Sequence, residues 1–445
     1  MSALPPAFRR LASSNLAAQF SEQIALAAAP LVAVLALGAT AAQTGYLQTA
    51  QTLPFLLLSL PAGVLADRLP RRTLMTSAEC VRAASLLALL ALLALGGLNL
   101  GWLAALGFLG AVGTVAYNVA APALVPTLVP APALGQANRW LELARSAAFS
   151  AGPALGGALV GGIGAAAAYG LATLLSLLAA GLLAGLPPQA PRGAPPAPPR
   201  GGFGGGGGGG GGAPPRAPPG VGAGGPPHGR GAAGGRHLWH ELRDGAAFVT
   251  GHPLLRPVLV TAVFFNLAWF VLQAVYVVYA VERLGLGAAG VGITLGVYGA
   301  GMLAGALAAP WLAGRLSFGA LIAAGPLCAL AASLILLSTL ALPSGLWAAA
   351  GFFLFGAGPI LWTIATTTLR QAITPNALLG RVSAVILTAT FGARPVGALI
   401  GAALASRLGL EACLWVSSAG FAAQFVVLAA SPVPRLRSQP EPVTG

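Results

Sequence analysis

The sequence contains no lysine and little charge of either sign. All 23 basic residues are arginine, so the chain lacks the ammonium group needed by Walker-type phosphate loops, Schiff bases and serine-lysine dyads. Charged residues make up 7% of the chain and hydrophobic residues 57%, whereas an ordinary soluble domain carries roughly 25% charged residues. The shortage of charge excludes a soluble globular protein of 445 residues. The absence of lysine excludes an ATP-driven pump built on this chain alone.

Cysteine is also scarce, and the sequence shows no recognisable set of catalytic residues. Cys80, Cys328 and Cys413 lie far apart in apolar stretches without a CxxC spacing, which indicates small core residues rather than a disulfide framework or a metal site. No carboxylate pair, nucleophile with a base, or cluster of metal ligands is evident. We therefore expect no enzymatic activity, no metal and no cofactor.

Long apolar runs, in contrast, dominate the chain. A helix needs roughly 20 apolar residues to cross a membrane, and twelve such runs occur, six before a polar gap and six after it. The first run is too long for a signal-peptide core, so we expect it to stay as a membrane span. The pattern predicts an all-α polytopic membrane protein with twelve transmembrane helices in two pseudo-symmetric six-helix bundles. The runs lie near 16–37, 44–66, 74–95, 101–121, 140–160, 165–186, 254–280, 290–313, 320–342, 345–368, 382–404 and 410–430.

The gap between the two sets of runs divides the chain. It consists almost entirely of Gly, Pro, Ala and Arg, a composition that predicts disorder. The halves around it are weakly similar, since a shift of 247 residues lays Ala41, Ala42 and Gly45 on Ala288, Ala289 and Gly292. We predict an N-terminal six-helix bundle (1–186), a disordered cytoplasmic linker (187–236), an amphipathic surface helix (237–253), a C-terminal six-helix bundle (254–431) and a cytoplasmic tail (432–445).

The arginines set the expected orientation. When successive loops are assigned to alternate faces, twenty of the 23 arginines, Arg82 included, fall on or near one face, which should be cytoplasmic. Only Arg283 and Arg407 fall on the other, and Arg394 lies deep within a span. We therefore expect the net charge of +14 to set the membrane topology and to interact with anionic lipid headgroups, and not to bind nucleic acid. We expect a multi-pass protein of the cell (inner) membrane with both termini cytoplasmic.

The short loop after the second run carries the most informative motif. Gly63 stands four residues before the pair Asp67 and Arg68, and Arg71 and Arg72 follow. An aspartate at a helix end can meet another helix's N-terminus and a nearby arginine in one conformation only, which makes a conformational latch. Glu142 and Arg145, spaced i and i+3, are placed where that latch could join them.

This loop resembles the signature of the major facilitator superfamily. The stretches Gln51-Thr-Leu-Pro-Phe55 and Leu60-Pro-Ala-Gly63 are similar to the transmembrane secretion effector branch, which includes siderophore exporters and macrolide efflux proteins. Pro70 stands where the family more often has Gly, and Gly314 stands where the second half would carry the Asp. The resemblance implies the major facilitator fold and transport by rocking of two halves.

A second motif lies in the fifth run, where Gly152 and Pro153 are followed by Gly156 and Gly157. Small residues at this spacing let helices approach closely, and by itself that favours simple packing. The complete pattern resembles the motif of the superfamily's antiporters, which implies export.

Charges inside the apolar runs are candidates for coupling to protons, because an ionisable group in a membrane is costly. Glu22 has no basic residue within a helical turn, so we predict a lone carboxylate that takes up and releases a proton. The alternative is a residue at the cytoplasmic rim. Arg394 should face a cavity and counter Glu22 or an anionic substrate group, or else donate to backbone carbonyls. The fourth run lacks the arginine of many proton-coupled drug exporters, so coupling is less well supported than export.

Polar and aromatic side chains at helical spacing predict the substrate cavity, because lipid offers such groups no partner. They suit a bulky, mostly apolar solute. The candidates are Gln48, Gln51, Tyr117, Asn118, Asn266, Trp269, Gln273, Tyr276, Tyr298 and Trp362.

Together these features predict a monomeric secondary active transporter that exports small, largely apolar organic molecules by alternating access, as a proton antiporter. Its partners would be the small-molecule substrate, protons and membrane lipids, with no nucleic acid. An alternative is a lipid or lysophospholipid facilitator of the same fold that needs no proton site.

Overall fold

The computed structural model describes residues 5–130, 133–187 and 234–440, and in these ranges it contains helices and connecting turns without strands. Apart from the short η2 (Val433–Arg435), the helices are long. They are α1 (Pro6–Leu35), α2 (Ala41–Arg68), α3 (Arg71–Ala94), α4 (Leu100–Leu128), α5 (Leu134–Gly162), α6 (Ala165–Ala184), α7 (Gly234–Gly251), α8 (Leu255–Glu282), α9 (Ala288–Ala313), α10 (Phe318–Ser338), α11 (Gly345–Ile373) and α12 (Asn376–Ala429).

The long helices agree with the twelve predicted spans once α7 is set aside and α12 is divided into two. Gly409, with φ 85°, interrupts α12, because this left-handed conformation ends one helix and glycine adopts it without a side-chain clash. Within the described residues, nine helical segments are long and apolar enough to cross a membrane, and one of them covers both arms of α12. α2 and α5, with 28 and 29 residues, match the others in length.

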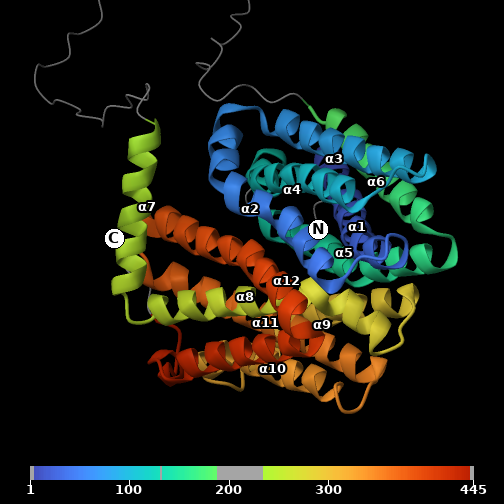
Figure 1. Cartoon of the computed structure of the whole chain (residues 1–445). Helices are drawn as coiled ribbons and strands as arrows, with labels where there is room; N and C mark the ends of the chain where they lie inside the picture. The colour runs from blue at the N-terminus through green and yellow to red at the C-terminus, as the bar shows by residue number, and fades with distance from the viewer. Residues whose placement is uncertain (1–4, 131–132, 188–233, 441–445) are drawn as a thin grey trace, which may run out of the picture.

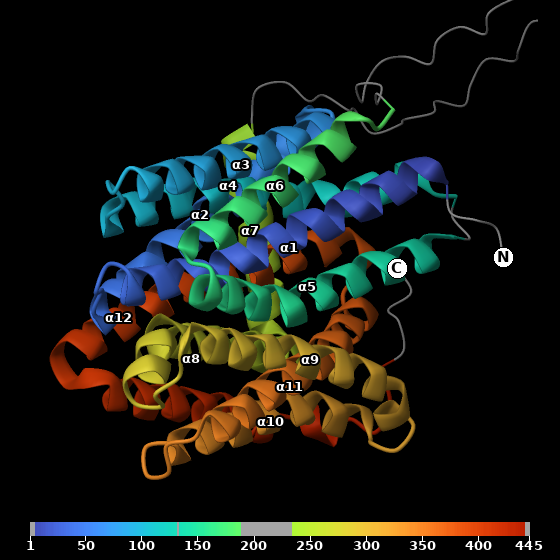
Figure 2. The same cartoon turned by 90° about the vertical axis from the view of Figure 1, so that its right-hand side faces the viewer.

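The helices form two groups, α1–α6 and α8–α12, and the first group lies above the second in both Figure 1 and Figure 2. The groups meet where α5 packs on α9 and where α2 packs on α12 and α8. The predicted fold, an all-α membrane protein of two six-helix bundles, is confirmed. Ala41 and Ala288, which the sequence repeat pairs, are the first residues of α2 and α9.

The beginning of α1 and the end of α6 share one end of the assembly (Figure 2), where Arg10 Nη1 donates to the Gly185 carbonyl at 2.6 Å. α7 covers most of the segment predicted as an amphipathic surface helix. It packs on α12 and α8, and Arg381 Nη1 donates to Asp244 Oδ2 at 3.1 Å. The location of α7 at a membrane surface stays a prediction, and the predicted linker lies outside the described residues except at its edges.

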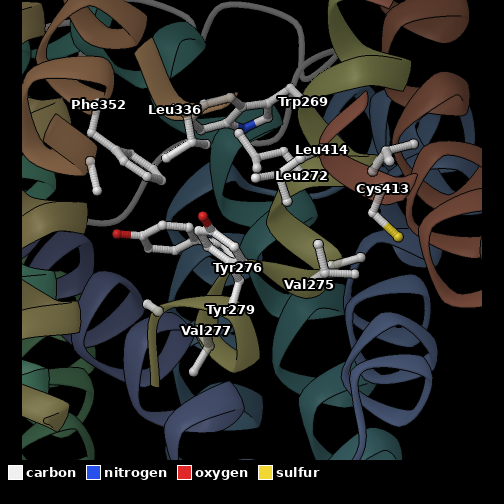
Figure 3. Packing of buried hydrophobic residues seen from close by; sticks show 14 of the residues in the cluster. Trp269, Leu272, Val275, Tyr276, Val277, Tyr279, Leu336, Phe352, Cys413 and Leu414 are labelled. Atoms are coloured by element: carbon white, nitrogen blue, oxygen red, sulfur yellow. The ribbon is translucent and has the colours of Figure 1, made fainter. Parts of the chain in front are cut away.

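The largest core belongs to the C-terminal group. Figure 3 shows how side chains of α8 pack with those of α10, α11 and the second arm of α12. The aromatic members contact each other, since the rings of Tyr276 and Phe352 are 4.4 Å apart and those of Trp269 and Phe355 are 5.0 Å apart. This packing gives the second group a dense interior, to which Leu31 of α1 also contributes.

Candidate functional site

Three charged side chains meet inside the N-terminal group, between α1 and α3. Arg82 Nη1 lies 3.0 Å from Glu79 Oε1, and Arg82 Nη2 lies 3.8 Å from Glu22 Oε2. The Glu79 and Arg82 side chains are 0% and 4% exposed, whereas that of Glu22 is 16% exposed. One arginine therefore stands between two carboxylates, and only Glu22 reaches the surface of the group.

Neighbouring polar groups hold this arrangement in place. Arg82 donates to the Ala18 carbonyl at 3.1 Å and to Thr114 Oγ1 at 2.9 Å. Ser176 of α6 donates to Glu79 Oε2 at 2.7 Å. Buried ions require such partners, because desolvation otherwise outweighs their attraction. The cluster draws on α1, α3, α4 and α6, so it can form only when these four helices have packed together.

The structure corrects two predictions here. The interpretation of Glu22 as a carboxylate without a basic partner is wrong, because α3 places Arg82 beside it. The assignment of Arg82 to the cytoplasmic face is also wrong, since Arg82 lies near the middle of α3 and is buried. Glu79 was missed altogether. Its signal is the i, i+3 spacing of Glu79 and Arg82 within the apolar run 74–95.

Arg394 lies in the first arm of α12, at the boundary between the groups. Its guanidinium carbon is 4.4 Å from the centre of the Phe391 ring and 5.6 Å from each of the Phe55 and Phe270 rings. Its Nε donates to Asn266 Oδ1 at 3.3 Å, so a side-chain amide rather than a backbone carbonyl is its partner. Within the part of the chain that the structure describes, Arg394 forms no ion pair within 4.0 Å.

The charges of the two groups act on one another. Arg82, Arg145 and Arg394 all interact electrostatically with Glu22, and Tyr298 of α9 interacts with Arg145 and Arg394. Electrostatic interactions fall off with distance and are strongest where water is excluded. Charges on α3, α5 and α12 are therefore near enough to Glu22 of α1 to act on its carboxylate.

The latch residues are only partly described. Gly63, Asp67 and Arg68 lie outside the described side chains. Arg72 donates to the Ala184 carbonyl at the end of α6, not to Glu142. Arg145 Nη2 and Nε donate to Glu142 Oε1 at 2.8 and 3.2 Å, with side chains 40% and 53% exposed. Glu142 and Arg145 thus form an ion pair on one helix, and the latch itself stays a prediction, as does the role of Arg71.

The glycine motif of α5 lies between two helices. A Cβ on Gly156 would lie 3.0 Å from the Ile24 carbonyl of α1, and one on Gly152 would lie 2.5 Å from Gln23 Cβ. On the opposite side, a Cβ on Gly157 would overlap the Ala288 carbonyl and lie 2.7 Å from Gly292 Cα of α9. The motif therefore allows close packing within the N-terminal group and across the boundary between the groups.

The predicted cavity residues separate into two sets. Tyr117, Trp269 and Tyr276 are buried; the Tyr276 hydroxyl donates to Thr294 Oγ1 at 2.6 Å, and Figure 3 shows Trp269 and Tyr276 inside the core. Gln51 is also buried and lies against Gly107. These four do not line an open cavity in this conformation. The others are half-buried or exposed: Gln48, Asn118, Asn266, Gln273, Tyr298 and Trp362.

Comparison with known proteins gives both a family and a fold. The profile of the family described as Major Facilitator Superfamily matches residues 11–398. No curated protein sequence is significantly similar to the chain. Among solved structures, a mutant of the nucleoside transporter NupG is similar at a TM-score of 0.69 and 9% identity, covering 95% of this chain and 99% of that one.

Two further structures have the same fold. A bacterial homologue of the iron transporter ferroportin, in an inward-facing state, gives a TM-score of 0.67 at 16% identity, covering 96% of this chain and 99% of its own. The peptide transporter POT in complex with sulfate gives 0.70 at 13% identity, covering 97% and 95%. At these identities the similarity establishes the fold alone.

Proposed function

Because the chain belongs to the major facilitator superfamily, we propose that it is a secondary active transporter that exports small, largely apolar organic molecules in exchange for protons. Membership of this family makes the chain a multi-pass membrane protein of a transporter superfamily, and this supports a transport activity rather than an enzymatic one. Export from the cytoplasm, the transmembrane secretion effector branch, the cell (inner) membrane and cytoplasmic termini are parts of the proposal.

The observation that carries the proposal is the partial exposure of Glu22 beside a buried ion pair. Arg82 is held by Glu79 at 3.0 Å, and Glu22 lies farther away at 3.8 Å with its side chain 16% exposed. Among the charged members of this cluster, Glu22 alone combines a weakly satisfied carboxylate with access from outside. Such a group can exchange a proton without dismantling the pair behind it.

We expect the Glu22→Gln variant to lose proton-driven transport. In proteoliposomes loaded with a fluorescent apolar dye, an imposed pH gradient should drive dye movement by the wild-type protein, and the variant should fall to the rate of empty liposomes. Glu22→Asp, which keeps the carboxyl group, should retain part of the activity. Dye exchange in the absence of a gradient should survive in both variants, because it requires no net proton movement.

Dye movement that ignores both the pH gradient and Glu22→Gln would contradict proton coupling. In that case, movement of a labelled lysophospholipid between the leaflets of the same liposomes would favour the facilitator alternative.

A further inference from the structure

Two of the ion pairs in the N-terminal group are complete in themselves. Arg82 forms an ion pair with Glu79, with Nη1 3.0 Å from Oε1, and both side chains are buried. Arg145 belongs to Glu142, at 2.8 Å on the same helix. These two pairs are neutral as units, so neither leaves a net charge for a ligand.

Arg82 compensates the Glu22 carboxylate only weakly. Arg82 Nη2, its nearest cation, is 3.8 Å away and donates its hydrogen bond to Thr114 at 2.9 Å. A charged hydrogen bond requires a shorter distance, about 2.7–2.9 Å. Within the described residues, no hydrogen bond reaches the Glu22 carboxylate, and its side chain is partly exposed.

Arg394 retains its positive charge. The rings of Phe55, Phe270 and Phe391 attract a guanidinium and fix its position, but an aromatic ring does not neutralise it. A guanidinium has five N–H donors, and one of them, on Nε, is used by Asn266 at 3.3 Å. Among the described residues no acceptor is bound to the two terminal nitrogens, so their donors are available to a ligand.

The two uncompensated charges belong to different groups and interact with each other. Glu22 is on α1 and Arg394 is on α12, and each acts on the other's charge. Phe55 of α2 reaches Arg394 from the N-terminal group, which places Arg394 at the boundary. A molecule between the groups would meet a carboxylate on one side and a guanidinium beside aromatic rings on the other.

We propose that the transported molecule is zwitterionic, with a cationic group bound by Glu22, an anionic group bound by Arg394 and an apolar body against the phenylalanine rings. The proposal rests on the proposed function and sharpens it. A cationic group and a proton compete for the same Glu22 carboxylate, which is the mutual exclusion that antiport requires. A singly anionic molecule would instead favour protonation of Glu22 and bind together with the proton.

Four compounds with one phenyl body separate these possibilities. Phenylalanine carries both charges, phenethylamine the cation, 3-phenylpropanoate the anion and 3-phenylpropanamide neither. We would measure how each inhibits dye exchange in proteoliposomes. A hydrogen bond to a charged group contributes roughly 1.5–3 kcal/mol, and about 1.4 kcal/mol corresponds to a tenfold change in affinity. Phenylalanine should therefore inhibit at concentrations at least about tenfold lower than either singly charged compound.

Two variants should remove this preference in different ways. In Glu22→Gln, phenylalanine should lose its advantage over 3-phenylpropanoate but keep it over phenethylamine. In Arg394→Gln the reverse should hold, and Arg394→Lys, which keeps the charge, should restore part of the preference if the glutamine variant folds poorly. Glu411→Gln, which removes one member of an exposed pair with Arg283, should change neither preference.

Equal inhibition by all four compounds, or inhibition by none of them, would overturn the zwitterion proposal. Either result is compatible with dye transport that still follows the pH gradient. The proposed function therefore fails only when the gradient and Glu22→Gln leave dye movement unchanged.

Discussion

Replacing Arg82 by methionine should lower the free energy of unfolding by about 3–5 kcal/mol, because it leaves the Glu79 carboxylate buried without its partner. Glu79 is 0% exposed, and within the described residues its Oε1 atom has no hydrogen bond besides the ion pair with Arg82. Unfolding of the purified protein in detergent, followed by circular dichroism, measures the loss.

The double variant Glu79→Gln/Arg82→Met should recover most of the lost stability. Removing both charges eliminates the desolvation cost that the single substitution leaves behind, and neutral replacements of buried pairs are often tolerated. If the double variant were no more stable than Arg82→Met, the loss would come from altered packing rather than from the unpaired carboxylate.

Arg283→Met provides the matched control. Its pair with Glu411 has a similar distance, 2.8 Å, but the side chains are 57% and 55% exposed. Exposed pairs contribute about 0–1 kcal/mol, so this variant should remain close to the wild type. A large effect at Arg283 would show that burial does not distinguish the two pairs.

The sequence predicts the fold more fully than the site because the two depend on different information. Each span is a local property, readable from about 20 consecutive residues, and even the break at Gly409 falls between two apolar runs. Glu22 and Arg82 are 60 positions apart in the chain, and their pairing depends on how α1 and α3 both pack against α4 and α6. No local pattern specifies which faces of two helices meet.

The same reasoning explains why two aromatic candidates lie in the core in this conformation. Tyr276 and Trp269 lie at helical spacing with Asn266 and Gln273, and periodicity assigns all four to one polar face. In the structure, Tyr276 satisfies its hydroxyl on Thr294 within the same group and joins the core. A tyrosine can bury its ring against other rings and satisfy its single hydroxyl locally. Asn266 has an amide with both donors and an acceptor to satisfy, and it remains at the boundary between the groups.

Replacing Gly157 by leucine should abolish transport without unfolding either group of helices. A side chain at this position would overlap the Ala288 carbonyl and the Gly292 backbone, both in the opposite group. Backbone atoms of two packed helices cannot yield as a flexible side chain can. The conformation described here, with α5 packed against α9, would become inaccessible. A transporter that cannot return to one of its two states should lose at least about tenfold in rate. A tenfold loss needs a destabilisation of only about 1.4 kcal/mol.

The loss should be confined to transport because the contact between Gly157 and α9 lies between the two groups and does not contribute to the packing within either group. Gly162→Leu, on the same helix, is the control, because a Cβ there meets nothing within 4 Å. Ala288 is 5% exposed, so in a variant without the native cysteines, Ala288→Cys should react slowly with a membrane-impermeant maleimide. Adding Gly157→Leu should speed that reaction several-fold, since the groups are then held apart. Unchanged labelling together with lost transport would instead mean that leucine distorts α5 itself, and the two groups would not move apart along this surface.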